Sequence, residues 1–159
     1  MMRSVIRLSD MTKADINAII RDDWRALEFY YTRDDAAREW RLVGSRDGLR
    51  NFSRILTRYA DNPRNDLKSE HDHFGPYMYL KIMTWPDAGI GENAIHGTLA
   101  DLRRLAAIVD DSIAAMQVGE TARIQSQFVP DAEYAIILDA REDETDPSAF
   151  DPELPKIVG

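Results

Sequence analysis

The sequence contains an internal repeat, because two stretches that begin 53 residues apart share one pattern of residue types. The first stretch covers residues 44–56 and the second covers residues 97–109. In both, a glycine is followed by serine or threonine, then by a Leu-Arg pair, and then by two aliphatic residues. Self-similarity of this kind indicates that one supersecondary unit occurs twice. We therefore expect a single domain over residues 1–159 that is built from two similar halves.

Each copy of the repeat is predicted to contain a helix with a capped N-terminus. Ser45 and Thr98 precede the two helical patterns, and a hydroxyl at that position accepts a hydrogen bond from a free backbone amide. Apolar residues spaced by three or four predict amphipathic helices over about residues 46–60 and 99–116. An extended segment precedes each glycine, and a β-rich run follows each helix. Each copy is therefore predicted to be a strand–helix–strand unit.

The two units cover about residues 38–83 and 92–140, and further strands are expected to complete them. The predicted hairpins pair residues 24–31 with 38–43, 80–85 with 92–96, and 120–128 with 133–140. An N-terminal helix is expected over about residues 12–22, with Thr12 and Asp15 as a capping box. This order predicts an α+β fold, with a mostly antiparallel sheet of about six strands, two repeat-related helices on one face, and a short N-terminal helix.

The composition of the chain excludes several classes of function. Of its 159 residues, 44% are apolar and none is cysteine, so a disulfide framework, a thiolate metal site and a cysteine nucleophile are excluded. The net charge of −8 disfavours nonspecific binding to nucleic acid or to anionic membranes. The longest apolar runs are about five residues, too short to cross a bilayer, and the N-terminus lacks the long apolar stretch of a secretory signal. We expect a cytoplasmic protein that binds no membrane.

The acidic charge is concentrated near the C-terminus. Residues 139–159 hold seven acids and two bases, a net charge of −5, whereas residues 38–68 hold eight bases and four acids, a net charge of +4. This asymmetry is compatible with an acidic tail that lies on a basic face of the same chain, or with two partner surfaces. Residues 141–159 contain three prolines and are expected to be irregular. The predicted contact residues for a basic partner are Glu142, Asp143, Glu144 and Asp146.

A stripe of arginines recurs every four residues on the first repeat helix, opposite its apolar face. Its members are Arg46, Arg50, Arg54 and Arg58. Such a stripe is able to hold phosphate groups or an acidic partner. The same pattern is typical of a solvated helix face, which we favour because the chain as a whole is acidic. Binding of phosphate or nucleic acid along this stripe is an alternative function.

Two histidines in one loop are the clearest candidates for metal ligands. The side chains of His71 and His73 point to the same side of an extended backbone, and a third ligand would come from His96, Glu70 or an aspartate. The competing interpretation has both rings hydrogen-bonded within the loop. We favour it because the sequence lacks a complete ligand set. A metal-dependent or small-molecule enzyme that uses this loop is therefore the second hypothesis.

Three runs of the sequence resemble one known family. Residues 44–56, 71–82 and 95–105 are together similar to bacterial immunity proteins of polymorphic toxin systems, specifically immunity protein family thirty-two. The similarity covers about residues 38–110. The resemblance implies a small, non-enzymatic cytoplasmic protein that neutralises a cognate toxin by direct binding. We expect the protein to use no cofactor. The resemblance assigns no functional residue.

Overall fold

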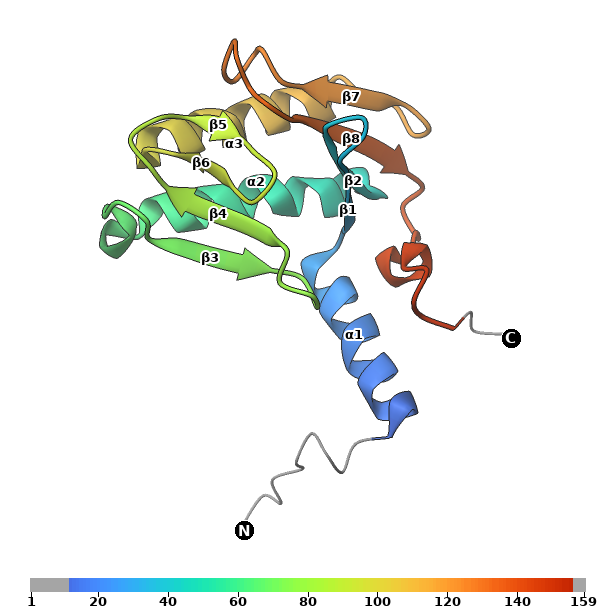
Figure 1. Cartoon of the computed structure of the whole chain (residues 1–159). Helices are drawn as coiled ribbons and strands as arrows, with labels where there is room; N and C mark the ends of the chain where they lie inside the picture. The colour runs from blue at the N-terminus through green and yellow to red at the C-terminus, as the bar shows by residue number, and fades with distance from the viewer. Residues whose placement is uncertain (1–11, 156–159) are drawn as a thin grey trace.

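The computed structural model describes residues 12–155. The last part of the predicted irregular tail, residues 156–159, lies outside this range, as do residues 1–11. Within the range, the chain forms three α-helices and eight strands (Figure 1). The order is α1 (Lys13–Leu27), β1 (Tyr30–Asp34), β2 (Glu39–Ser45), α2 (Arg46–Asp61), the 3-10 helix η2 (Pro63–Asn65), β3 (His71–Phe74), β4 (Leu80–Thr84), β5 (Gly89–Ile90), β6 (Ile95–Gly97), α3 (Leu99–Ala114), β7 (Thr121–Ile124), β8 (Ala135–Arg141) and the 3-10 helix η3 (Pro147–Phe150).

The strands of residues 12–155 form two four-stranded mixed sheets, with the orders β1-β2-β8-β7 and β3-β4-β6-β5. In each sheet the two central strands are parallel, and each edge strand is antiparallel to its neighbour. The predicted α+β class is confirmed, and so is the hairpin between residues 120–128 and 133–140, which is the β7–β8 pair. The prediction of one mostly antiparallel sheet of about six strands is wrong. Turn signals define hairpins locally, whereas the association of hairpins depends on contacts between distant residues.

Each of the two sheets combines one pair of strands from the first half of the chain with one pair from the second half. The hairpin before α2, β1 with β2, shares a sheet with the hairpin after α3, β7 with β8. Likewise, β3 and β4 share the second sheet with β5 and β6. The central parallel pairs, β2 with β8 and β4 with β6, therefore join the two halves. The predicted hairpin of residues 80–85 with 92–96 is wrong, because β5 takes the antiparallel position beside β6 and leaves β4 and β6 parallel.

Both repeat helices begin at the predicted caps. The Ser45 hydroxyl accepts a hydrogen bond from the Gly48 amide at 2.9 Å at the start of α2. At the start of α3, Thr98 and Asp101 form a capping box with bonds of 3.0 and 3.1 Å. These bonds satisfy backbone amides that have no partner within the first helical turn. The cap predictions are confirmed.

Helix α1 begins at the predicted capping box of Thr12 and Asp15 and continues five residues beyond its predicted end. Residues 24–31, predicted as a strand, therefore begin as the last turn of this helix. The reason lies in tertiary packing, because the indole of Trp24 is only 1% exposed and lies against the rest of the molecule. Glu28, with a φ of 74°, then ends the helix and turns the chain toward β1. In Figure 1 the N-terminal part of α1 projects from the body of the protein.

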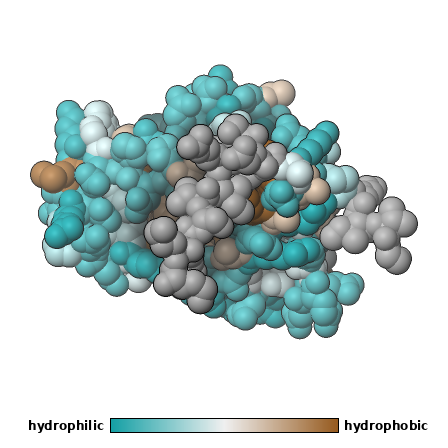
Figure 2. Space-filling view, turned by 90° about the horizontal axis from the view of Figure 1, so that it is seen from below, coloured by the Kyte–Doolittle hydropathy of each residue, from teal (hydrophilic) through white to brown (hydrophobic). Residues whose placement is uncertain are grey.

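Helices α2 and α3 pack side by side and cover the sheets (Figure 1). Helix α2 contacts β2 and β8, and α3 contacts β6 and β7. The buried faces include Leu49, Phe52 and Leu56 of α2, and Leu102, Leu105 and Val109 of α3. Seen from the side of α1, the visible surface is largely hydrophilic with small separate apolar patches (Figure 2). Within the described part of the chain, no helix is both long and apolar enough to cross a membrane.

Candidate functional site

A surface pocket with a volume of about 320 Å³ lies where five segments of the described chain meet. The segments are α1, β1, β2, the loop between β3 and β4, and residues 151–153 after η3. Six of the eleven lining residues are aromatic: Trp24, Tyr30, Tyr31, Trp40, Tyr77 and Tyr79. Asp151, Glu153 and Arg33 supply charged groups. We refer to this site as the aromatic pocket.

Trp24 is the centre of the aromatic packing. Its ring centroid lies 4.8 Å from that of Tyr30, 5.1 Å from that of Tyr31 and 6.0 Å from that of Tyr77. Tyr31 in turn lies 6.1 Å from Trp40. Edge-on and tilted arrangements of this kind are favourable between aromatic rings. Packing therefore holds the pocket wall in place.

The hydroxyl of Tyr31 joins the first sheet to the β3–β4 loop. It donates to the Phe74 carbonyl at 2.6 Å and accepts from the amides of Tyr79 and Leu80 at 3.1 and 3.2 Å. Gly75, with a φ of 86°, lies directly against the Tyr31 ring, and a Cβ there would come within 2.6 Å of the ring. Burial raises the pKa of Tyr31, which keeps its hydroxyl protonated as a donor. Tyr31 thus sets the position of the loop that carries Tyr79.

A buried carboxylate, that of Asp151, lies at the end of the pocket next to α1. Its Oδ2 accepts hydrogen bonds from the Trp24 indole at 2.9 Å and from the Tyr77 hydroxyl at 2.5 Å. Its Oδ1 accepts from the Glu153 amide at 2.9 Å. Burial, together with the hydrogen bond to Asp151, raises the pKa of Tyr77. These bonds fix the C-terminal segment against α1 and the β3–β4 loop.

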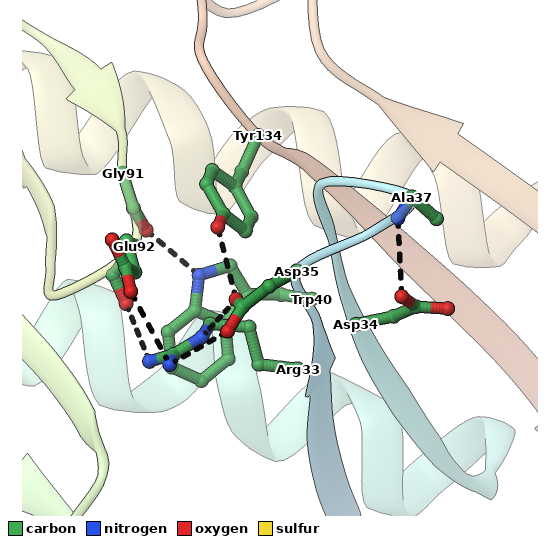
Figure 3. Close-up of polar contacts among 8 residues, drawn as sticks. All are labelled: Arg33, Asp34, Asp35, Ala37, Trp40, Gly91, Glu92 and Tyr134. Atoms are coloured by element: carbon green, nitrogen blue, oxygen red, sulfur yellow. Dashed lines mark hydrogen bonds and ion pairs between the residues drawn. The ribbon is translucent and has the colours of Figure 1, made fainter.

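Beside Trp40, a cluster of polar contacts joins the two sheets (Figure 3). The guanidinium of Arg33 lies 5.6 Å from the centroid of the Trp40 ring and donates to the Asp35 carboxylate at 2.5 Å. It also donates to the Glu92 carbonyl at 2.9 Å, while the Trp40 indole donates to the Gly91 carbonyl at 2.9 Å. The hydrogen bond from Arg33 lowers the pKa of Asp35. The charge of Arg33 is therefore balanced by acids of the chain itself.

The predicted acidic contact surface is divided by the structure. Three of its members are exposed: Glu142, Asp143 and Glu144. The fourth, Asp146, caps η3 by accepting hydrogen bonds from the amide and hydroxyl of Ser148. Arg25 of α1 also donates to Asp146 at 2.9 Å, and this hydrogen bond lowers the pKa of Asp146. Asp146 therefore anchors the tail to α1, and the other three acids are free of such a role and exposed.

The predicted arginine stripe lies on α2 and is partly neutralised by acids. All four of its members belong to this helix: Arg46, Arg50, Arg54 and Arg58. Asp47 lies 3.6 Å from Arg50 and 3.9 Å from Arg54. Asp143 of the acidic tail lines a shallow hollow together with Arg46. Part of the stripe is therefore matched by acids of the same chain.

The three predicted metal-ligating histidines do not converge. His71 and His73 lie side by side on β3, with ring centroids 5.0 Å apart. Their Nδ1 atoms donate to the carbonyls of Ser69 and Met78, each at 2.9 Å, since a carbonyl only accepts. His96 lies on β6, which β4 separates from β3. Among residues 12–155, no group of three His, Cys, Asp or Glu side chains is arranged to hold a metal ion.

The aromatic pocket has no counterpart among the predictions from sequence. Its residues lie between positions 24 and 153 and follow no common spacing. Two closely spaced tyrosine pairs, Tyr30-Tyr31 and Tyr77-Met-Tyr79, are present in the sequence, but 46 positions separate Tyr31 from Tyr77. Nothing in either pair indicates that the two would meet.

Comparisons of the chain with protein-family models, with curated proteins and with solved structures find no match. The resemblance to immunity proteins stays a prediction. The aromatic pocket and the charges around it carry the proposal that follows.

Proposed function

We propose that this chain is a non-enzymatic binding protein whose partner protein docks over the aromatic pocket. The observation that carries the proposal is the convergence of six aromatic side chains from four chain segments on one surface hollow. Aromatic residues dominate the energetic centres of protein interfaces, because each buries a large area while restricting few rotatable bonds. A hollow of this composition is suited to receive side chains of a partner.

The rim of the pocket exposes apolar surface. Met78 and Tyr79, adjacent on the β3–β4 loop, are 55% and 67% exposed. Large exposed apolar side chains beside a hollow are typical of interaction surfaces when polar residues surround them. The hydrogen bonds to Tyr31 already order this loop, so the loop would lose little conformational entropy when a partner binds.

We propose a basic protein as the partner, in keeping with the net charge of −8. The exposed acids Glu142, Asp143 and Glu144 belong to the segment that leads into Asp151 of the pocket. Complementary charge steers two proteins together and raises their rate of association. Following the sequence resemblance, the proposed partner is a cognate bacterial toxin that this protein neutralises in the cytoplasm by direct binding.

The test uses Tyr79→Ala, because Tyr79 is exposed and lines the pocket. Leu67→Ala is the matched control, since Leu67 is 65% exposed and lies outside the pocket. The wild type and Leu67→Ala should bind the toxin encoded by the adjacent gene and restore growth of cells that express it. Tyr79→Ala should bind about tenfold more weakly or worse.

Two results of this assay would contradict the proposal. If Tyr79→Ala binds as tightly as the wild type, the aromatic pocket is not the docking site. If the wild type neither binds the adjacent gene product nor protects the cells, the immunity function is wrong. Circular dichroism of both variants checks that the fold is retained.

A further inference from the structure

We infer that the aromatic pocket binds the cationic end of a basic side chain, and that a guanidinium group fits it best. This inference rests on the proposed function, since the cation would belong to the partner protein. Three features of the pocket support it: the aromatic ring faces, two carboxylates without a cationic partner, and an arginine of the chain on the same wall.

The pocket walls present several aromatic rings that lie close to one another. The ring centroids of Tyr77 and Tyr79 are 6.0 Å apart with an angle of 33° between their planes, and Tyr77 also lies 6.0 Å from Trp24. A cation is attracted to an aromatic face within about 6 Å of the ring centroid. Because these rings line one volume of about 320 Å³, a single planar cation would contact more than one of them.

The two acids of the pocket lack a cationic partner in the described part of the chain. Asp151 accepts hydrogen bonds from uncharged donors, namely an indole, a phenol and an amide. No lysine or arginine of residues 12–155 forms an ion pair with Asp151 or Glu153. Burial raises the pKa of Tyr30, and the charges of Asp151 and Glu153 add to this effect. The pocket is therefore negative, and partial burial strengthens its attraction for a cation.

The chain itself places one guanidinium on the wall of the pocket. Arg33 lines the pocket, and its guanidinium lies 5.6 Å from the centroid of the Trp40 ring. Asp35 and Glu92 pair with this arginine, so its charge does not neutralise Asp151. The contact shows that an aromatic face combined with a carboxylate accommodates a guanidinium at this place in the fold.

The size of the pocket limits what it can receive. A volume of about 320 Å³ lies at the lower end of the range of small-molecule sites, about 300–1,000 Å³. It suits one long side chain better than an extended oligosaccharide. A lysine ammonium would satisfy the charge, but the planar guanidinium of arginine also stacks on ring faces and binds carboxylates through two donors. Arginine is therefore the occupant that we specify.

The experiment titrates the full chain with the tripeptide Gly-Arg-Gly and with Gly-citrulline-Gly, which has nearly the same shape without the charge. The NMR signals of the indole N–H groups of Trp24 and Trp40 report binding at the pocket. We expect saturable shifts with the arginine peptide at a millimolar Kd, and about tenfold weaker binding of the citrulline peptide. Glu153→Gln should weaken binding of the arginine peptide about threefold or more. Glu142→Gln, which lies outside the pocket, should leave the affinity for this peptide unchanged.

Three results would overturn the inference: equal affinity for the two peptides, no saturable shift with the arginine peptide at about 50 mM, or unchanged affinity in Glu153→Gln. Each of these leaves the proposed function in place if Tyr79→Ala still weakens binding of the partner, because an uncharged group then fills the pocket. If Tyr79→Ala leaves partner binding unchanged, the proposed function fails whatever the peptides do.

Discussion

The hydroxyl of Ser53 donates a hydrogen bond of 3.2 Å to the carbonyl of Ala106, and these two residues occupy the same position in the two copies of the sequence repeat. Ser53 lies on α2 and Ala106 on α3, and both are almost fully buried. Equivalent positions can touch only where the two halves of the molecule meet. Small side chains at this position allow the two helices to approach closely.

Substitution of Ser53 tests this contact between the helices. Leucine would have to fit between two packed backbones, so we expect Ser53→Leu to lower the free energy of unfolding by about 1–3 kcal/mol. Ser53→Ala keeps the side chain small and loses one hydrogen bond, which costs about 1 kcal/mol or less. Urea unfolding of the three proteins provides the comparison. A leucine variant as stable as the alanine variant would show that the helices are not closely packed here.

Gly48 lies in the first turn of α2, directly against the carbonyl of Glu28. A Cβ on Gly48 would lie 2.2 Å from that oxygen, well inside van der Waals contact. Alanine normally stabilises a helix by about 1 kcal/mol relative to glycine, but we expect Gly48→Ala to destabilise this protein by at least that amount. Gly91→Ala is the control, because its Cβ would meet its nearest neighbour at 3.5 Å. A higher melting temperature for Gly48→Ala would contradict the close contact.

The hydrogen bond from Tyr77 to Asp151 makes a prediction about stability. Tyr77→Phe removes one of two side-chain donors to a buried carboxylate, so we expect the free energy of unfolding to fall by about 1–3 kcal/mol. Tyr79→Phe is the matched control, since Tyr79 is exposed and its hydroxyl forms no hydrogen bond within residues 12–155. Chemical denaturation of both variants measures the difference. Equal stability of the two would mean that the C-terminal segment is not anchored through Asp151.

The ion pair of Arg25 with Asp146 makes a prediction about pH. Arg25 lowers the pKa of Asp146 below its ordinary value of 3.8, so the pair stabilises the fold above pH 3.8 and loses its effect as the pH falls below that value. Both side chains are more than a third exposed, so solvent screening limits the contribution to about 1 kcal/mol or less. The difference in unfolding free energy between the wild type and Asp146→Asn should therefore be present at pH 7 and shrink at pH 3. A difference that is independent of pH would exclude this role for the ion pair.

The helix starts were predictable because capping is local. Ser45 and Thr98 each accept a hydrogen bond from an amide three residues further along the chain. Trp24, in contrast, belongs to an aromatic run that is typical of a strand, yet it lies in a helix. Its indole donates to Asp151, which is 127 positions away. No pattern within a few residues of Trp24 indicates its contact with Asp151 or its place in a helix.

The candidate site also depends on contacts between residues far apart in the sequence, which local patterns do not predict. Glu144 and Asp146 are two positions apart in the sequence, but only Asp146 contacts Arg25, 121 positions away, and becomes a structural residue. The aromatic pocket is built from five segments that are distant in the sequence, so no local pattern of residues indicates it. The sequence shows that these side chains are present, but it does not indicate that they meet at one site.

By itself, the sequence determined the two amphipathic helices, their caps and the fact that one pattern occurs twice, because periodicity and capping act over a few residues. Only the tertiary structure decided which hairpins share a sheet, with β2 beside β8 and β4 beside β6. Pairing of distant strands costs loop-closure entropy, which burial of residues far apart in the chain must offset. The same long-range association brings Trp24, Trp40 and Asp151 together, so the aromatic pocket exists only in the folded protein.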